Sequence, residues 1–399
     1  MTKDLLSQAG GLREQLVAWR RWFHQHPELS FEEYGTSAFI ASICREQGWE
    51  VRTGVAGTGV IALMRGGSDG DRVALRADMD ALPIEEVEGR PYGSTNKGVM
   101  HACGHDAHMA MVLGAGVLLK ERVQQIAGSV LLVFQPGEEK LPGGASLLIE
   151  QGALSDPAPK AILAQHATPE LECGTVGLHA GPFMASADEL CLTVKGRGGH
   201  AAMPHLLIDP VVIAAHLIVA LQQVVSRRAR PGEPTVLSFG KVVADGATNV
   251  IPGEVRIEGT LRAFDETWRN ELHRLMPKMA KGLVASMGAE LEFEIRKGYP
   301  VLVNDPSLTG SFRAIAERLI GPEQVLDVPQ RMGAEDFAAY TQVMPGLLVR
   351  LGTGRADGVP SSGLHTSTFD VNEDALPIGS ALMASWVLDQ LARDRAPIG

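Results

Sequence analysis

Nine residues, from Met100 to His108, constrain this chain more than any other segment. They read Met-His-Ala-Cys-Gly-His-Asp-Ala-His and carry one thiol, three imidazoles and one carboxylate. Thiolates and neutral imidazoles are strong ligands for zinc-like divalent cations. Cys103 and His105 are separated by one glycine, so both side chains can point from one tight loop toward one ion. A helix expected over 107–121 would present its N-terminus there, which favours a thiolate. Taken in isolation, a buried cysteine beside surface histidines explains the same residues.

Length and composition limit the class of protein. With 399 residues, the chain is long enough for two domains. Hydrophobic residues make up 45% and charged residues 21%, which is typical of a globular enzyme. The net charge of −11 argues against nucleic acid or an anionic membrane as a partner. We expect no signal peptide and no run long and apolar enough to span a bilayer. The four scattered cysteines do not resemble a disulfide framework, so we expect a cytoplasmic protein with reduced thiols.

The first half of the chain alternates short apolar runs with helical patterns. This alternation predicts an α/β sheet covered on both faces, in which ligands collect at the carboxyl ends of the strands. Asp78, Glu138, Glu139 and His166 each fall just past an expected strand end. Helices are expected over 11–23, 36–46 and 107–121, and strands over 59–64, 72–76, 129–134 and 161–165.

The pattern changes near Ser186, where the order becomes strand, helix, strand, strand, helix, strand. That order is typical of a split ferredoxin-like unit. We therefore predict a discontinuous α/β catalytic domain, residues 1–185 and 299–399, with a mixed, mostly parallel sheet. An inserted α+β domain would occupy 186–298. The elements expected in the insertion are 189–194, 210–225, 235–243, 254–263, 266–287 and 291–296, and those expected after it are 307–319, 347–351 and 374–391.

Further candidate ligands follow the Cys-Gly-His segment. Of the adjacent carboxylates Glu138 and Glu139, one can bind metal while the other takes a proton from the attacking water; an exposed acidic turn is the alternative. His166 ends an apolar run and His365 lies in a glycine-rich loop, and either could be an ordinary structural histidine. Five ligands exceed the needs of one tetrahedral zinc, so two ions about 3.5–4 Å apart would use them.

Four other residues have candidate roles near such a centre. Asp80, or its neighbour Asp78, could orient a ligand, or simply cap a polar turn. His200 follows a run of glycines and could stabilise an oxyanion, or be incidental to a flexible loop. Asn249 and Arg262 could grip a substrate carboxylate, although each is equally typical of a protein surface.

Together these motifs resemble the aminoacylase and glutamate-carboxypeptidase family of two-metal peptidases. The resemblance is to its amidohydrolase branch, which includes hippurate hydrolases, auxin (IAA)-amino-acid conjugate hydrolases and N-acetyl-diaminopimelate deacetylases. It runs over nearly the whole chain. The segments that carry it are Arg20 to His24 with Pro27, Glu28 and Glu32 or Glu33, then 77–83, 100–108, 135–139, 198–204 and 332–337.

The resemblance implies a zinc-exopeptidase-like catalytic domain and an inserted lid or dimerisation domain, in a homodimer or larger homo-oligomer. It implies two divalent ions (Zn, Mn, Ni or Co), with Glu138 as general base and acid and Asp80 supporting the metal site. It also implies that His200 stabilises the tetrahedral intermediate in the neighbouring subunit, and that Asn249 and Arg262 lie near the carboxylate end of the substrate. The implied metal ligands are Cys103, His105, Glu139, His166 and His365.

The expected function is hydrolysis of the amide of a small N-acyl or N-aroyl amino acid by a metal-activated water. One alternative is a dipeptidase or aminopeptidase of the same family. That activity needs an acidic group to hold a free α-amine, and the sequence identifies none. The other alternative is a non-catalytic metal-binding homologue, which would be expected to have lost the base, so the presence of Glu138 counts against it.

Overall fold

The computed structural model describes residues 2–354 and 362–392. Residues 1, 355–361 and 393–399 lie outside the described residues. They belong to the segments predicted for the catalytic domain, 1–185 and 299–399. The chain divides into two compact units. Unit 1 comprises Met1–Gly181, Val303–Pro329 and Asp336–Gly399, and unit 2 comprises Pro182–Leu302 with Gln330–Glu335. The short second excursion into unit 2 was not indicated by the sequence pattern.

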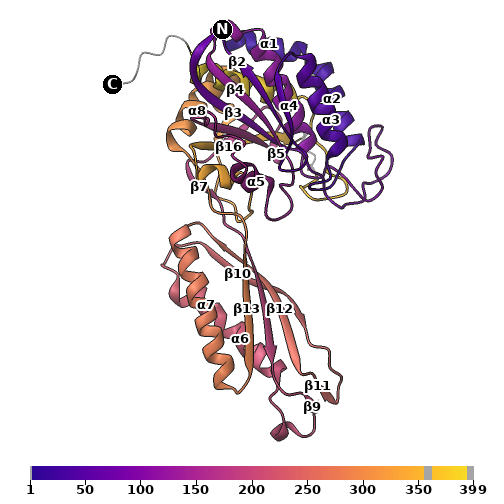
Figure 1. The fold of residues 1–399 in the computed structure, drawn as a ribbon, viewed down its shortest axis with the longest axis vertical. Helices are drawn as coiled ribbons and strands as arrows, with labels where there is room; N and C mark the ends of the chain where they lie inside the picture. The colour runs from indigo at the N-terminus through magenta and orange to yellow at the C-terminus, as the bar shows by residue number, and fades with distance from the viewer. Residues whose placement is uncertain (1, 355–361, 393–399) are drawn as a thin grey trace. The chain divides into compact units, whose positions relative to one another are not determined.

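Unit 1 is built on a mixed sheet of eight strands in the order β1-β2-β4-β3-β5-β16-β6-β15 (Figure 1). Its centre is parallel, because β3 pairs in parallel with both β4 and β5, and β5 pairs in parallel with β16. The predicted α/β class with a mixed, mostly parallel sheet is confirmed. The strands are β1 (Glu50–Val55), β2 (Gly59–Arg65), β3 (Ser68–Asp78), β4 (Ala127–Gln135), β5 (Ile162–Glu172), β6 (Val176–Leu178), β15 (Val325–Asp327) and β16 (Gly346–Gly354).

The helix α4 (His105–Lys120) forms the centre of the unit 1 core. It is apolar nearly all round, as expected for a helix enclosed by other elements. Gly114 lets two neighbouring helices approach it closely, since a Cβ there would lie 2.5 Å from atoms of both Leu16 and Ser380. The remaining helices of unit 1 are α1 (Thr2–Gly11), α2 (Arg13–Gln25), α3 (Tyr34–Glu46), α5 (Gly144–Glu150), α8 (Pro306–Ile320), α9 (Ala338–Thr341) and α10 (Ala375–Gln390), with 3-10 turns η1 (Val123–Gln125) and η4 (Pro322–Gln324).

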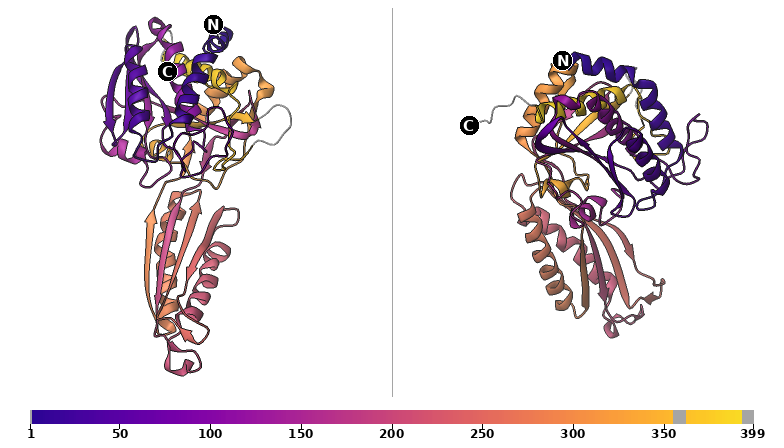
Figure 2. Two further views of the ribbon diagram at one scale, coloured as in Figure 1. Left: turned by 90° about the vertical axis from the view of Figure 1, so that its right-hand side faces the viewer. Right: turned by 45° about the horizontal axis from the view of Figure 1, so that its top comes forward.

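Unit 2 is an antiparallel sheet in the order β10-β12-β8-β13, with two helices packed on one face (Figure 2). Leu190, Leu192 and Val194 alternate along β8 and all point into the core under these helices. A role as a lid or dimerisation domain stays a prediction. The elements are β8 (Asp188–Lys195), β9 (Gly199–His200), η2 (Pro204–Leu206), α6 (Pro210–Gln223), the π-helical turn η3 (Val224–Arg228), β10 (Thr235–Val243), β11 (Val250–Ile251), β12 (Glu254–Ala263), α7 (Glu266–Ser286) and β13 (Glu290–Lys297); β7 (Gly181–Met184) and β14 (Leu302–Asn304) lie where the chain passes between the units.

The segment Pro210–Arg228, which is α6 with its π-helical turn, corrects one expectation. Among the described residues it is long and apolar enough to cross a membrane, so the prediction that no run meets this criterion is wrong. One side of the segment packs in the core of unit 2 through Ile213, Leu217 and Leu221. Its apolar composition therefore serves at least in part to fill that core.

A buried ion pair fixes the end of unit 2 where β8 begins and β13 ends. Asp188 is 1% exposed and accepts hydrogen bonds from Arg269 Nε at 2.9 Å and Arg269 Nη2 at 2.5 Å. His273 Nε2 lies 2.6 Å from the same carboxylate, and the Gly298 N–H donates to it at 3.1 Å. Burial alone would raise the pKa of Asp188, but the hydrogen bonds from Arg269 and His273 lower it to about 2.

We predict that Asp188→Asn destabilises unit 2 by about 3–5 kcal/mol, because it leaves the Arg269 guanidinium buried beside a neutral amide. Amide hydrogen exchange of β8 and α7 measures the effect. A carboxyl with a depressed pKa stabilises the fold above its unfolded pKa of about 3.9. The difference between wild type and variant should therefore be constant above about pH 4 and shrink as the pH falls toward 2. A difference that does not change with pH over this range would contradict the assignment.

Candidate metal centre

The candidate ligands of unit 1 come from segments at the carboxyl ends of its central strands. Asp78 is the last residue of β3, and the Glu138–Glu139 turn follows the end of β4. His105 is the first residue of α4, after Gly104 with φ +87°. The expectation that His166 follows a strand end is wrong. It lies inside β5, in register with Arg350 of β16, because the pairing of these two strands continues past the apolar run.

The structure brings the five expected ligands together in overlapping groups. Cys103 Sγ lies 3.6 Å from His166 Nε2, and His365 Nε2 lies 3.3 Å from Glu139 Oε1. The distance from His105 Nε2 to Glu139 Oε1 is 4.0 Å. The sets whose donor atoms all lie within 4.8 Å of one another include Cys103 with His105 and His166, Cys103 with Glu139 and His365, and His105 with Glu138 and Glu139.

The donor set fits divalent cations. Within residues 2–354 and 362–392, no hydrogen-bond partner reaches the buried His105 Nε2, although carboxylate oxygens of Asp78 and Glu139 lie 3.7 and 4.0 Å away. A buried polar atom without a partner costs about 1–3 kcal/mol, which a bound cation would offset. Thiolate, imidazole and carboxylate together suit zinc and its neighbours in the first transition series.

Burial governs the protonation of these ligands. Burial and the nearby Arg350 cation lower the pKa of His166 well below its usual value, so its imidazole is neutral. The pKa of the Cys103 thiol rises to about 12, first through burial and then through the neighbouring Glu139 carboxylate. A cation bound here would therefore release a proton from Cys103.

Asp80 holds two ligand-bearing segments with one buried carboxylate. Its Oδ1 accepts the backbone N–H of Glu138 and its Oδ2 that of Glu139, both at 3.0 Å. Ser30 Oγ donates to Oδ2 at 2.6 Å. The Asp80 carbonyl accepts from His105 Nδ1 at 2.8 Å, which leaves Nε2 as the donor atom toward the centre.

Glu33 is a buried residue near the site to which the sequence analysis assigned no role, although it named Glu32 or Glu33 in a motif. Its Oε1 accepts the N–H of Gly137 at 2.9 Å, and its Oε2 accepts from Thr58 Oγ1 at 2.5 Å. Three consecutive N–H groups of the turn, from Gly137 to Glu139, thus donate to buried carboxylates. Gly137 has φ +60°, and a Cβ there would lie 2.3 Å from the Phe31 ring. Gly137, directly before the glutamate pair, is the sequence feature that could have indicated a tightly held turn at this point.

The other two histidines of the Met100–His108 segment have different surroundings. His108 Nδ1 lies 2.6 Å from Asp78 Oδ1, and its Nε2 accepts the N–H of Ala167 at 2.8 Å, so both ring nitrogens are occupied. His101 is buried, and neither ring nitrogen has a hydrogen-bond partner among the described residues. Burial lowers its pKa to about 3, so its imidazole is neutral.

Three expected site residues lie in unit 2. His200 and Asn249 are brought together at the β9–β11 ribbon, where His200 pairs with Val250 and the Ala201 N–H donates to the Asn249 carbonyl at 3.0 Å. Arg262 lies near the opposite end of β12, eight residues from Glu254, which is about 27 Å along a strand. Arg262 donates from Nε to Thr260 Oγ1 at 3.1 Å. Within one chain, Asn249 and Arg262 are therefore too far apart to grip one carboxylate.

Comparison with known proteins identifies the family. The model of peptidase family M20/M25/M40 matches residues 74–389. The N-acetyl-L-cysteine deacetylase of Bacillus subtilis is 41% identical over 96% of this chain and 88% of its own length. The N-acyl-L-amino acid amidohydrolase of Geobacillus stearothermophilus is 40% identical over 81% and 88%. The crystal structure of Bacillus subtilis YxeP, described as a dinuclear metal-binding peptidase from the M20 family, has a TM-score of 0.83 and 35% identity and covers 96% of this chain and 99% of that one.

The chain belongs to peptidase family M20/M25/M40 and is a hydrolase of that family. The resemblance drawn from the motifs is confirmed. The roles of the individual site residues stay predictions.

We predict that Asp80→Asn lowers the affinity for divalent cations about 10–100-fold, the usual effect of losing a partner that orients ligands. An amide has one acceptor oxygen, so one of the two N–H groups of the glutamate turn would lose its partner. Titration calorimetry of the metal-free protein with Zn²⁺ measures the effect. Glu28→Gln is the matched control, because Glu28 also accepts two backbone N–H groups, from Gly35 and Thr36, away from the turn. Equal affinities in wild type and Asp80→Asn would refute this role.

Proposed function

We propose that this protein is a metal-dependent amidohydrolase that cleaves the amide bond of N-acyl or N-aroyl amino acids. One observation carries the proposal: the buried carboxylate of Glu138 lies beside the candidate ligands His105 and Glu139, with donor atoms of all three within 4.8 Å. A second carboxylate next to a ligating one has the position required of a general base. The names of the deacetylase and amidohydrolase relatives support the choice of an acylated amino acid as the substrate.

In this proposal, Cys103, His105, Glu139, His166 and His365 hold two divalent ions, which are zinc, manganese, nickel or cobalt. When bound, the ions would polarise the scissile carbonyl and lower the pKa of the attacking water. Glu138 takes a proton from that water and later delivers it to the leaving amine. Asp80 and Glu33 fix the backbone of the turn on which Glu138 lies, so the base does not need to reorganise between the two transfers.

We propose that His200 stabilises the oxyanion in the neighbouring subunit of a homodimer, with Asn249 beside it at the substrate carboxylate. His200 is exposed, and its Nδ1 accepts the Ala202 N–H at 3.1 Å, so Nε2 carries the proton of the neutral ring. That N–H is a donor of the kind an oxyanion needs. Arg262 would contact the substrate carboxylate, since its guanidinium is half-buried and donates a hydrogen bond only to the neutral Thr260 hydroxyl among the described residues.

We also propose a reducing, cytoplasmic location. Cys103 must stay reduced to ligate a cation, and all four cysteines of the chain are free thiols.

A comparison of two substrate sets tests the proposed function. The protein is stripped of metal, reloaded separately with Zn²⁺, Mn²⁺, Co²⁺ and Ni²⁺, and assayed with hippurate and N-acetyl amino acids, and in parallel with dipeptides that carry a free α-amine. The proposal expects hydrolysis of the acylated set and little of the dipeptides. Preferential cleavage of the dipeptides would establish a peptidase instead, and no hydrolysis of either set with any ion would refute the proposed substrate class.

We predict that Glu138→Gln lowers kcat by about 10²–10⁴-fold, because an amide cannot accept the proton of the water. The variant should retain its metal, since Glu139 and the other ligands remain. Cys103→Ser is the contrasting variant, because it removes a soft ligand and should mainly reduce metal content. Steady-state kinetics and elemental analysis of both proteins provide the readouts. A Glu138→Gln protein with near-normal kcat would rule out this residue as the base.

A further inference from the structure

His365 is the least enclosed of the expected ligands. Its side chain is 51% exposed and its backbone has φ +60°, a conformation that non-glycine residues seldom adopt. Residues 365–368 are all exposed, so core packing does not set their position. The His365 N–H donates to the Ala102 carbonyl at 2.8 Å, which joins this loop to the segment that carries Cys103. The Val87 N–H donates to the Ser367 carbonyl at 3.0 Å, and further anchors hold the segment that follows.

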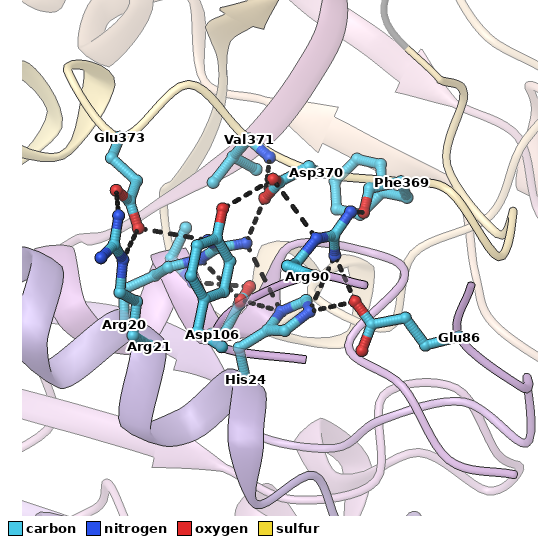
Figure 3. A network of polar contacts seen from close by, with 12 residues as sticks. Arg20, Arg21, His24, Glu86, Arg90, Asp106, Phe369, Asp370, Val371 and Glu373 are labelled. Atoms are coloured by element: carbon cyan, nitrogen blue, oxygen red, sulfur yellow. Dashed lines mark hydrogen bonds and ion pairs between the residues drawn. The ribbon is translucent and has the colours of Figure 1, made fainter. Parts of the chain in front are cut away.

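Arg20 supplies such an anchor from within α2 (Figure 3). Its side chain is fully buried, and its Nε donates to Asp106 Oδ2 at 2.8 Å. On the other side, its Nη2 donates to Asp370 Oδ1 at 2.6 Å and its Nη1 to Glu373 Oε1 at 3.3 Å. One guanidinium therefore joins the residue after His105 to a residue five positions after His365.

Other groups hold the same segment at Asp370. Tyr92 donates from its hydroxyl to Asp370 Oδ2 at 2.8 Å, and Arg90 donates from Nη2 to the Phe369 carbonyl at 2.9 Å. Phe369 and Val371, on either side of Asp370, are buried. His24 lies between Asp106, at 2.7 Å from Nδ1, and Glu86, at 3.0 Å from Nε2. The anchor is thus a network that reaches α2, the start of α4 and the loop around residues 86–92 (Figure 3).

We propose that Arg20 and Asp370 are positioning residues that set the affinity of the metal position shared by Glu139 and His365. The inference rests on the two-ion centre of the proposed function. Neither residue contacts that position directly, and both act through the backbone between Asp370 and His365. Loss of their link should release the His365 loop and leave Cys103, His105 and His166 in place, because these three lie on buried elements. The affinity for the ion at Glu139 and His365 would then fall, while the affinity for the other ion would not change.

Asp370→Asn is the primary test, since the Asp370 side chain is 34% exposed and removing its charge leaves the buried Arg20–Asp106 pair intact. Arg21→Ala is the matched control. Arg21 also donates to Glu373, at 2.8 and 2.7 Å, but among the described residues it makes no hydrogen bond to Asp106 or Asp370. The metal-free proteins are titrated calorimetrically with Mn²⁺. We expect one of two binding events to weaken about 10–100-fold in Asp370→Asn, the other to be unchanged, and Arg21→Ala to match the wild type.

Hydrogen exchange in the metal-free proteins gives a readout independent of activity. Amides between 364 and 372 should exchange faster in Asp370→Asn than in the wild type or Arg21→Ala. The proposal is overturned if both binding events keep their wild-type affinity, if both weaken equally, or if the wild type binds only one ion. The two proposals can fail separately. If the wild type binds two ions and Asp370→Asn weakens the affinity for one of them, this inference is supported. If the same wild type does not hydrolyse N-acyl amino acids, the proposed substrate is refuted.

Discussion

The geometry of the site depends on a buried carboxylate, Asp80, that accepts hydrogen bonds from segments far apart in the sequence. Its carboxylate oxygens accept hydrogen bonds from the N–H groups of Glu138 and Glu139, which lie 58 and 59 residues away. Its backbone carbonyl accepts a hydrogen bond from His105 Nδ1. Charge-assisted hydrogen bonds to a buried carboxylate are stronger than neutral ones and sensitive to direction. They fix the backbone on which the candidate base and two candidate ligands lie. Without them, the turn after β4 would lose two of the three N–H contacts that join it to buried carboxylates.

The same arrangement recurs around the centre. Glu33 accepts a hydrogen bond from the N–H of Gly137 in the glutamate turn. Asp78 orients His108 through its Nδ1, and His108 Nε2 accepts the N–H of Ala167 in β5. Arg20 joins the start of α4 to the segment that follows His365. Burying these charged groups is unfavourable unless each is paired. Their pairing therefore specifies one arrangement of loops around the ligands, and the parallel strands beneath provide the common edge from which the loops extend.

The sequence predicted the elements whose burial leaves a pattern. The run from Leu131 to Phe134 is fully buried and lies in a central strand, and the alternation of Leu190, Leu192 and Val194 marks a half-covered one. It did not predict β1, because Glu50–Val55 is an edge strand whose residues are mostly exposed. It placed His166 beyond a strand because the apolar run ends at Gln165, whereas the pairing with β16 continues β5 to Glu172. Local sequence patterns do not predict such pairing between strands that are far apart in the chain.

The candidate ligands were found from residue types and motif order, because thiol, imidazole and carboxylate side chains have few other reasons to gather. Their supporting groups were harder to find. Arg20 belongs to a motif that carries the family resemblance, but Asp370 lies 350 positions away and nothing in the sequence links the two. The central claim is that five donors converge on two cations, and anomalous X-ray scattering from crystals of the zinc-loaded protein tests it most directly. The account predicts two peaks within about 2.0–2.3 Å of donor atoms from Cys103, His105, Glu139, His166 and His365. Peaks bound by other side chains, or a single peak that leaves His365 without an ion, would contradict it.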